Sequence, residues 1–553
     1  MWDQIYIPVT GSLGWSAALA TLPILVLFIA LGIVRLTAWK SGLLGLLCAC
    51  LVARFLYGMP TPLILSSAAY GAAFGLLPIV WIVYWAVALY RLTVDTGQFE
   101  IIKDSVGHLT RDPRLLALLI AFAFGAFLEG AAGFGTPVAV AAAMMTGLGF
   151  TPFQAATLCL IANTAPVAFG AIGTPLVTLA GVTNLPLADL SADVGRICAP
   201  VSLFIPAYLM LVMGGWPALS AALPPAAVCG ICFAVVQFLV SNYLGPYLTD
   251  ILASLAAIVG LLALMQVWRP ASAAAGATAG GAGAAALSSP GFSATATAGA
   301  TARIPTPILL RAWSPYILLI IFVLLWGFMP FKALLDKATI VFGWPGLDGH
   351  VRRLAPVVST PGPYAAKFTL NLLSASGTSA MLATLCTALF LRVSAKQFVA
   401  SLCRTTRDLA FSILTITSVV GLAYVMNYSG TTATLALALA ATGASFPFFS
   451  ALLGWLGVFL TGSDTSANAL FGNLQVVTAN RLGFSPSLMA AVNSSGGVMG
   501  KMVSLQSISV AAAATGMPPE DEARLFRFTL KHSLFLAAII GAIAMLYSYV
   551  LPF

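Results

Sequence analysis

The sequence contains very little charge. Only 7% of its 553 residues are Asp, Glu, Lys or Arg, whereas 60% are hydrophobic. Soluble proteins carry about 25% charged residues, so a soluble enzyme is excluded. At about 20 apolar residues per bilayer crossing, the hydrophobic runs suffice for about 12 to 14 transmembrane spans. The sequence therefore predicts an all-α polytopic membrane protein.

Histidine and cysteine are also scarce. The three histidines, His108, His350 and His532, lie near charged or Pro/Gly-rich sequence, which argues against paired axial ligands for a haem. The eight cysteines are scattered. The closest pair with zinc-like spacing, Cys229 and Cys232, has no second pair and no nearby histidine. We therefore expect no metal site and no cofactor.

Positive charge exceeds negative charge, with 25 Lys and Arg against 16 Asp and Glu. In a membrane protein such an excess belongs to cytoplasmic loops, so the expected partner is the lipid bilayer and not a nucleic acid. Residues 1–10 have no basic segment and contain Asp3, which argues against a cleaved signal peptide. Loops 35–40 and 91–114 are both basic and are separated by two expected spans. The N-terminus is therefore expected on the outer, periplasmic side.

Residues 271–302 consist almost entirely of Ala, Gly, Ser and Thr and carry no charge. Such a composition predicts a flexible linker, 271–304, rather than a span. Basic residues on both sides of it predict a cytoplasmic location. The linker divides the chain into an N-terminal transmembrane half, 1–270, and a C-terminal transmembrane half, 305–553.

Three short segments of the first half recur in the second half, in the same order and at nearly constant spacing. The pairs are 125–130 with 457–462, 148–152 with 482–486, and 163–170 with 493–500. Loops 91–114 and 392–407 are basic, whereas the corresponding positions in the other half carry no charge. Because positive loops stay on the cytoplasmic side, we expect two repeats of inverted topology with a site between them.

Two acidic residues stand alone in long uncharged stretches. Glu129 is the only charged residue in 115–188, and Asp464 is the only one in 409–480. An ionised carboxylate in mid-bilayer costs about 2.5–3.5 kcal/mol. Both acids lie in runs of small residues that are typical of broken helices or re-entrant hairpins. The glycines expected at these hairpins are Gly130, Gly133, Gly135 and Gly462.

We interpret the two acids as the proton-coupling groups of a transporter. Glu129, among small apolar residues, is expected to carry the proton, while Asp464 organises a pocket to which Ser463 and Thr465 contribute. Structural acids bonded to free backbone N–H groups are the alternative. Sodium coupling at Asp464 is a rival, because carboxylate, hydroxyl and carbonyl oxygens suit a hard cation. A membrane-embedded enzyme with an acid dyad is a weaker alternative.

Further polar residues interrupt apolar runs. One polar pair occurs in each half, Asn163-Thr164 and Asn493-Ser494, and Lys501 follows shortly after the second. These side chains suit an anionic substrate in a site of low dielectric constant. Bonds between helices are the alternative for the two pairs. Lys501 can instead pair with Asp464 or extend to the membrane interface.

At these runs the chain resembles the L-lactate permease family of bacterial secondary transporters. The segments that carry the resemblance are GAFLEGAAGFG (125–135), NTAPVAFG (163–170), NYSG (427–430), GWLGVFLTGSDTS (454–466) and LFRFTLKHS (525–533). The resemblance implies uptake of L-lactate, and also of D-lactate and glycolate, with protons across the bacterial inner membrane. It places the chain in a wider ion-transporter group with paired re-entrant hairpins and Asn-Thr motifs, which favours Asn163, Thr164, Asn493 and Ser494 as substrate ligands. Leu505 stands where the family has Pro, which weakens the expectation of a backbone break there.

Overall fold

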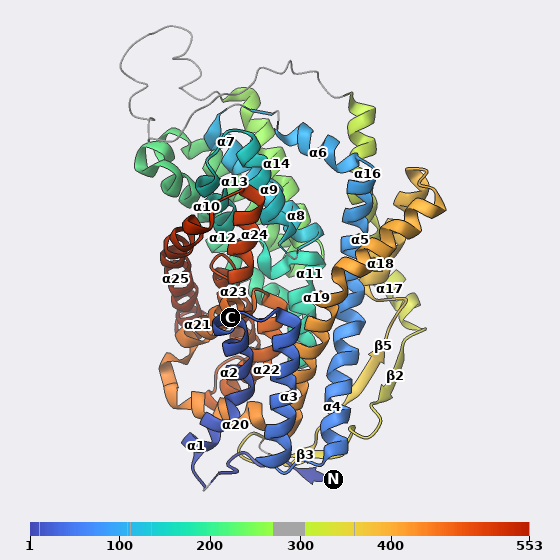
Figure 1. Cartoon of the computed structure of the whole chain (residues 1–553), viewed down its shortest axis with the longest axis vertical. Helices are drawn as coiled ribbons and strands as arrows, with labels where there is room; N and C mark the ends of the chain where they lie inside the picture. Colours follow the sequence, from blue (N-terminus) through green and yellow to red (C-terminus); the bar gives the residue numbers. More distant parts are fainter. Residues whose placement is uncertain are drawn as a thin grey trace.

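The computed structural model shows a tall helical molecule (Figure 1). It describes residues 1–9, 11–107, 109–110, 112–133, 135–268, 305–358 and 360–551. The expected linker, 271–304, lies outside the described residues.

The first half contains one short strand, α-helices, and helical turns of wider or tighter pitch marked η. They are β1 (Trp2–Asp3), α1 (Leu13–Ala20), α2 (Leu22–Phe28), η1 (Ile29–Ile33), α3 (Ala38–Phe55), α4 (Thr61–Phe74), η2 (Gly75–Val80), α5 (Trp81–Asp95), α6 (Gln98–Gly107), α7 (Pro113–Leu116), η3 (Ala117–Phe124), α8 (Gly125–Ala131), α9 (Thr136–Gly147), α10 (Pro152–Ala162), η4 (Val167–Phe169), α11 (Gly170–Thr183), α12 (Leu187–Ala221), α13 (Leu223–Tyr243) and α14 (Thr249–Val267).

The second half adds four short strands to its helices. Its elements are α16 (Thr306–Gly327), α17 (Met329–Asp336), β2 (Ile340–Gly343), β3 (Val351–Arg353), β4 (Gly362–Pro363), β5 (Lys367–Leu370), α18 (Ser376–Phe390), α19 (Ala395–Ser429), α20 (Thr431–Leu439), η6 (Ala440–Ser445), α21 (Phe446–Thr461), α22 (Asp464–Leu482), α23 (Pro486–Lys501), α24 (Leu505–Thr515) and α25 (Pro519–Tyr549).

The predicted all-α membrane architecture is confirmed. Within the described residues, 11 helices are long and apolar enough to cross a membrane, or up to 12 if the bent pair Pro152–Ala162 and Val167–Thr183 forms one span. The first number is just below the expected range of about 12 to 14 spans, and the second is at its lower edge. Apolar segments such as Pro137–Gly147 and Ser376–Phe390 form helices of fewer than 18 residues, which are too short to span the bilayer unaided.

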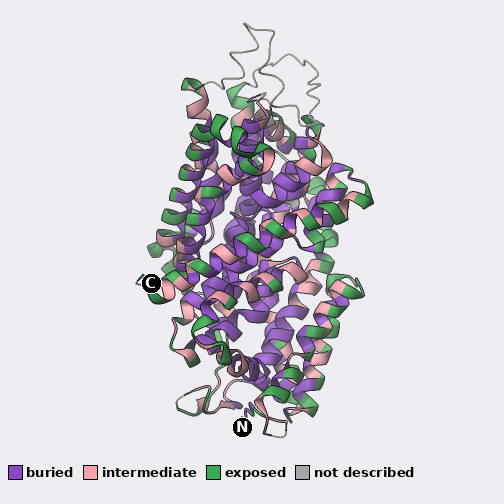
Figure 2. Ribbon diagram, turned by 90° about the vertical axis from the view of Figure 1, so that its left-hand side faces the viewer, coloured by how far each residue is buried: buried purple, intermediate pink, exposed green. Residues whose placement is uncertain are grey.

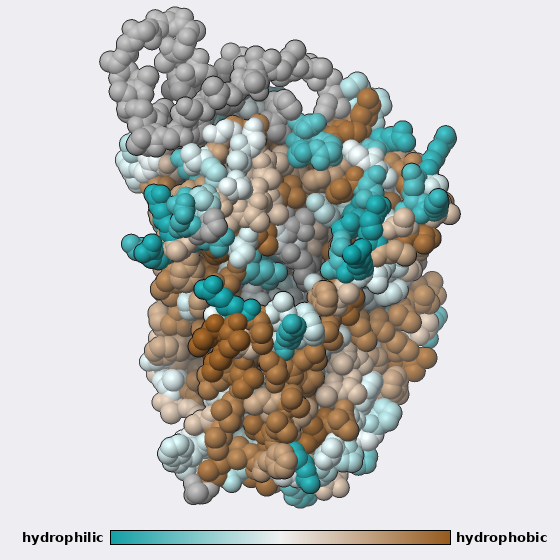
Figure 3. All heavy atoms as spheres, in the orientation of Figure 1, coloured by the Kyte–Doolittle hydropathy of each residue, from teal (hydrophilic) through white to brown (hydrophobic). Residues whose placement is uncertain are grey.

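Side chains exposed on the outer helices are apolar, as a lipid environment requires. On α3, Leu43, Leu47, Leu51 and Phe55 are all exposed, and their spacing of four residues places them on one face of the helix. Figure 3 shows a nearly continuous hydrophobic surface over the lower half of this face of the molecule. Buried helices run through the centre (Figure 2). The segment Pro113–Ala131, which carries Glu129, is completely enclosed by protein.

The N-terminus and the ends that flank 269–304 lie at opposite ends of the molecule (Figure 1). At the N-terminal end, β1 pairs with β3 and β3 with β4, while β2 and β5 form a separate antiparallel pair. The Arg352 guanidinium donates two hydrogen bonds to the Asp3 carboxylate, at 2.8 and 2.6 Å. These bonds lower the pKa of Asp3. Which of these two ends faces the cytoplasm stays a prediction from the charge pattern.

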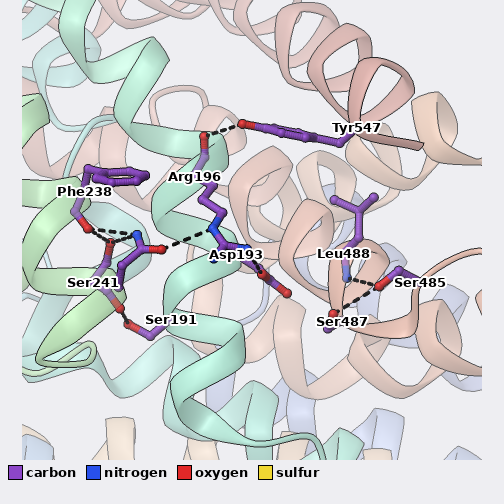
Figure 4. Close-up of polar contacts among 10 residues, drawn as sticks. Ser191, Asp193, Arg196, Phe238, Ser241, Ser485, Ser487, Leu488 and Tyr547 are labelled. Carbon is purple, nitrogen blue, oxygen red and sulfur yellow. Dashed lines mark hydrogen bonds and ion pairs between the residues drawn. The ribbon is translucent and has the colours of Figure 1, made fainter. Parts of the chain in front are cut away.

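A polar cluster connects the two halves where α12 and α13 meet α23 and α25 (Figure 4). Ser191 donates to the carbonyl of Ser241 at 2.8 Å, and Arg196 lies 3.4 Å from Asp193. Tyr547 of the second half donates to the carbonyl of Arg196 at 3.4 Å. Helices of both halves thus form one packed unit here.

The three recurring sequence segments lie on helices that follow one another in the same order. In the first half they lie in α8, between α9 and α10, and between α10 and the start of α11. In the second half they lie at the end of α21, between α22 and α23, and within α23. The local structure differs, however. Asn163 directly precedes a bend of 65°, whereas Asn493 lies within the continuous helix α23. Inverted topology of the two segments stays a prediction.

Candidate functional site

A small cavity of about 110 Å³ lies between the two halves of the chain. Glu129, Gly170 and Pro175 line it from the first half. Residues 461–466, Lys501 and Gln506 line it from the second half, and Ser412 and Thr415 of α19 close one side. The residues predicted from sequence that line this cavity are therefore Glu129, Ser463, Asp464, Thr465 and Lys501, together with Gly462.

Glu129 lies in the last turn of α8, which is a short helix followed by a tight turn. Gly133 and Gly135 adopt φ values of +60° and +84°, a left-handed conformation that residues with side chains rarely adopt. A Cβ atom at Gly133 would also lie 2.8 Å from the Cβ atom of Ala171. Gly133 and Gly135 thus lie at the break after Glu129, whereas Gly130 lies within α8 and not at the break.

The Glu129 side chain is enclosed, with 3% of its residue surface exposed. A Cβ atom at Gly170 would lie 2.6 Å from its Oε1 atom, so only glycine leaves room for the carboxyl group. Its Oε2 atom has no hydrogen-bond partner among the described residues. Because the free carbonyl groups at a helix C-terminus carry partial negative charge, the last turn of α8 disfavours an ionised Glu129.

Asp464 has the opposite position, at the first residue of α22. Gly462 ends α21 with φ +73°, and Ser463 caps α22 by accepting a hydrogen bond from the backbone N–H of Ser466. The Asp464 Oδ2 atom accepts hydrogen bonds from Ser494 Oγ at 2.6 Å and from Asn468 Nδ2 at 3.2 Å. A helix N-terminus and two donors both favour the ionised carboxylate.

Lys501 is the last residue of α23 and is 8% exposed, so it does not extend to the membrane interface. Its ammonium group donates to the carbonyl of Gly462 at 2.9 Å. It faces both Glu129 and Asp464. No ion pair within 4.0 Å joins it to either acid in the part of the chain described here. The cavity therefore holds one buried ammonium group that is not bonded to a carboxylate.

The two predicted polar pairs lie behind the cavity rather than on its surface. Thr164 donates to the carbonyl of Ile161 at 2.7 Å, and Asn163 lies beside Glu129. Asn493 donates to Asn468 Oδ1 at 2.9 Å, while Ser494 bonds to Asp464. Asn163 thus lies next to one acid, Asn493 and Ser494 belong to the hydrogen-bond network of the other, and Thr164 bonds only to the backbone. Direct binding of substrate by these residues stays a prediction.

The polypeptide is unwound or strained around this site. Ala171, Ile172 and Gly173 all have left-handed backbone angles, which is unusual for residues with side chains. In the second half, α23 ends at Lys501 and α24 begins at Leu505. The backbone break is therefore present although Leu505 is not a proline; the Ser504 hydroxyl caps α24 instead.

Sequence reasoning missed several neighbours of the acids. Asn468 follows Asp464 by one helical turn, so its spacing already indicated a shared face. Asp250, at the start of α14, reaches the vicinity of Glu129 only through tertiary packing. Ser412 and Thr415 are ordinary residues of a long span, and no local pattern marks them.

A larger vestibule of about 1060 Å³ adjoins the small cavity. The two share Ala38, Thr461 and Gln506. Arg35 and Arg527 lie on the vestibule wall. Basic side chains therefore lie along the route to the small cavity on the side of loop 35–40.

Comparison with known proteins identifies the family. The chain is 46% identical over 559 residues to the glycolate permease GlcA of Escherichia coli (99% of this chain, 98% of the relative). It is 45% identical to an L-lactate permease of Bacillus subtilis (99% of each chain). It is 42% identical to an L-lactate permease of Escherichia coli (100% of this chain, 99% of the relative).

A solved structure, the YdaH transporter of Alcanivorax borkumensis, matches 88% of this chain and 87% of its own, with a TM-score of 0.45 and 15% identity. That similarity is too low to support an inference. The sequence profile of the L-lactate permease family, in contrast, matches residues 16–551. This protein therefore belongs to the L-lactate permease family, as its motifs predicted.

Proposed function

We propose that this protein takes up L-lactate, D-lactate and glycolate by proton symport across the bacterial inner membrane. Its relatives are named as permeases for lactate or glycolate, which favours a transporter over an acid-dyad enzyme. One structural observation carries the proposal: the buried ammonium of Lys501 and the enclosed carboxyl group of Glu129 line the same small cavity.

The cavity suits a small organic anion. Its volume of about 110 Å³ leaves room for several water-sized groups, which is compatible with a substrate of a few heavy atoms. The Lys501 ammonium would bind the substrate carboxylate. Hydroxyl groups of Ser463 and Thr465 are available to the 2-hydroxyl group that lactate and glycolate share. Short 2-hydroxymonocarboxylates therefore match both its size and its polar groups.

Charge repulsion supplies the coupling between anion and proton. An ionised Glu129 beside the substrate carboxylate would repel it by about 3 kcal/mol at about 5 Å and an effective dielectric constant of about 20. A protonated Glu129 removes that repulsion. Anion and proton therefore bind together, and the transported complex is neutral. A membrane potential, worth about 2.3 kcal/mol per charge per 100 mV, then neither drives nor opposes transport.

The position of Lys501 favours protons over sodium as the coupling ion. Asp464 Oδ1 has no partner among the described groups, and the Gly462 carbonyl lies nearby, so oxygen ligands are present. The Lys501 ammonium, however, already bonds to that carbonyl at 2.9 Å. A sodium ion in the same place would be repelled by it. Asp464 serves better as the fixed counter-charge of Lys501.

The charge pattern gives the orientation that we propose. The basic loop 35–40 faces the cytoplasm, so the vestibule next to it opens to the cytoplasm. The N-terminus, at the far end of the molecule, is then periplasmic. In this arrangement the substrate leaves its cavity past Gln506, towards Arg35 and Arg527.

Uptake of radiolabelled L-lactate into proteoliposomes tests the proposal. An inward proton gradient and an inward sodium gradient are imposed separately, with protein-free liposomes as the control. Accumulation driven by the proton gradient alone is expected. Accumulation driven by sodium alone would reject proton coupling, and no uptake of lactate or glycolate under either gradient would reject the substrate.

A further inference from the structure

Asp250 is a second enclosed carboxylate beside the site, and the transport scheme above does not use it. It lies in the first turn of α14 and is 1% exposed. Neither of its carboxylate oxygens has a hydrogen-bond partner among the described residues. Buried polar groups in folded proteins are nearly always hydrogen-bonded. An acid left in this state needs a proton or another ligand close by.

Helices α8 and α14 touch at the residue that follows Glu129. A Cβ atom at Gly130 would lie 2.7 Å from the Cβ atom of Asp250 and 3.0 Å from the backbone nitrogen of Ile251. Glycine at position 130 therefore allows the two helices to approach closely. This contact brings the Asp250 carboxylate within electrostatic range of Glu129. Glu129 lines the substrate cavity, whereas Asp250 does not.

Hydrogen-bond acceptors exceed donors around Glu129. Its Oε2 atom, both oxygens of Asp250 and the Oδ1 atom of Asn163 all lack a partner among the described residues. The Nδ2 atom of Asn163 is the matching donor without a partner. Its two N–H groups cannot satisfy all four acceptor atoms. A proton on one carboxyl group turns an acceptor into a donor and allows an O–H···O bond between the acids.

The helix ends assign the proton to one member of the pair. Glu129 is in the last turn of α8, where partial negative charge favours the neutral acid. Asp250 is in the first turn of α14, where partial positive charge favours the carboxylate. Two nearby carboxyl groups in different environments separate into an acid and a base. The described titratable groups that face this pair are the Cys198 thiol of α12 and, on the Glu129 side, Lys501.

We propose that Asp250 is the positioning partner of Glu129: Glu129 holds the coupling proton, and the Asp250 carboxylate determines how tightly it is held. This inference rests on the proposed proton symport. When the proton leaves, the O–H bond of Glu129 breaks and two adjacent carboxylates remain. Their repulsion favours return of a proton before the next anion binds. The pair therefore couples proton binding to anion binding.

The test uses the full-length protein and the variants D250N, E129Q and D193N. Asp193 provides a matched control, because it is also buried but bonds to Arg196 and lies on α12. Infrared difference spectra recorded across a pH titration, without substrate, follow the band of protonated carboxyl groups. The pH dependence of lactate uptake into proteoliposomes is the second measurement.

We expect D250N to move the midpoint of both pH profiles to lower pH by about one to two units, because a neighbouring negative charge is removed. D193N should leave the midpoint unchanged, and E129Q should abolish the titrating band. An unchanged midpoint in D250N, or an equal shift in D193N, would overturn the inference. The inference would also be overturned if E129Q kept a titrating band that disappeared in the E129Q/D250N double variant, because Asp250 would then hold the proton. If D250N does not fold, E129Q alone still decides, because a titrating band that persists without Glu129 would overturn the inference.

The infrared measurement separates this inference from the proposed function. The infrared measurement needs no substrate. If the pair titrates as expected but the protein does not transport lactate, the proposed substrate is wrong and the proposed role of Asp250 stands. If the protein transports lactate in response to a proton gradient but the pH midpoint of D250N is unshifted, the proposed function stands and the proposed role of Asp250 is wrong.

Discussion

Replacing Glu129 with glutamine is the sharpest test of how anion and proton are coupled. Glutamine has the shape of a protonated glutamate but cannot release a proton. E129Q should therefore bind lactate at every pH and exchange internal for external lactate. It should not accumulate lactate in response to a proton gradient, because no proton travels with the substrate.

The structure gives the size of the effect. Glu129 lines the cavity of about 110 Å³, and we take a separation of about 5 Å between its carboxyl group and a substrate carboxylate bound there. At an effective dielectric constant of about 20, two negative charges at this distance repel by about 3 kcal/mol, which is on the order of 100-fold in affinity. The KM of the wild-type protein should therefore rise by about this factor between acid and alkaline pH.

The assay is lactate exchange in proteoliposomes at equal pH on both sides, measured over a range of pH values. E129Q should give a KM that is flat with pH and close to the acid limit of the wild-type protein. Glu100 provides a matched control: it is partly exposed on α6, pairs with Lys103 and lies outside the cavity, so E100Q should behave as wild type. A KM for E129Q that rises with pH as steeply as that of the wild type would refute the role of Glu129.

Three further substitutions test the remaining groups. K501M removes the ammonium that faces the substrate carboxylate. It should raise the KM for lactate exchange by about 100-fold, in the range typical of losing a buried charged partner. A KM within a few fold of wild type would reject Lys501 as a ligand. D464N should weaken lactate binding yet keep the proton-driven accumulation ratio, measured as internal over external label, and a ratio of one would instead assign proton coupling to Asp464. G497A adds a Cβ atom 2.5 Å from the Asp464 Oδ1 atom and should lower the exchange rate at least about tenfold. G147A, which meets open space at the end of α9, is its control and should have no effect.

The candidate site was visible in the sequence where a residue was unusual for its surroundings. Glu129 and Asp464 were predictable because an isolated charge in a long apolar run is costly and needs a reason. Glycines beside them predicted broken helices, and the structure places Gly133, Gly135 and Gly462 at left-handed turns. Family membership followed from the same segments and is confirmed by the profile match over residues 16–551.

The sequence matches between the two halves predicted the order of their helices but not where each helix breaks. The sequence matches 163–170 with 493–500, but the first segment unwinds directly after Asn163 while the second continues as a helix to Lys501. Local sequence similarity does not fix where a helix breaks, because neighbouring helices supply or withhold the partners of the freed backbone groups.

Composition and hydropathy by themselves determined that this protein is an all-α membrane protein, because the cost of transferring charge into lipid adds up residue by residue along the chain. Only the tertiary structure decided which groups meet. It places Asp250 against Gly130, Lys501 on the carbonyl of Gly462, and α19 against the cavity. Contacts between residues far apart in the chain depend on how helices pack, and packing is a property of the whole fold that no local pattern contains.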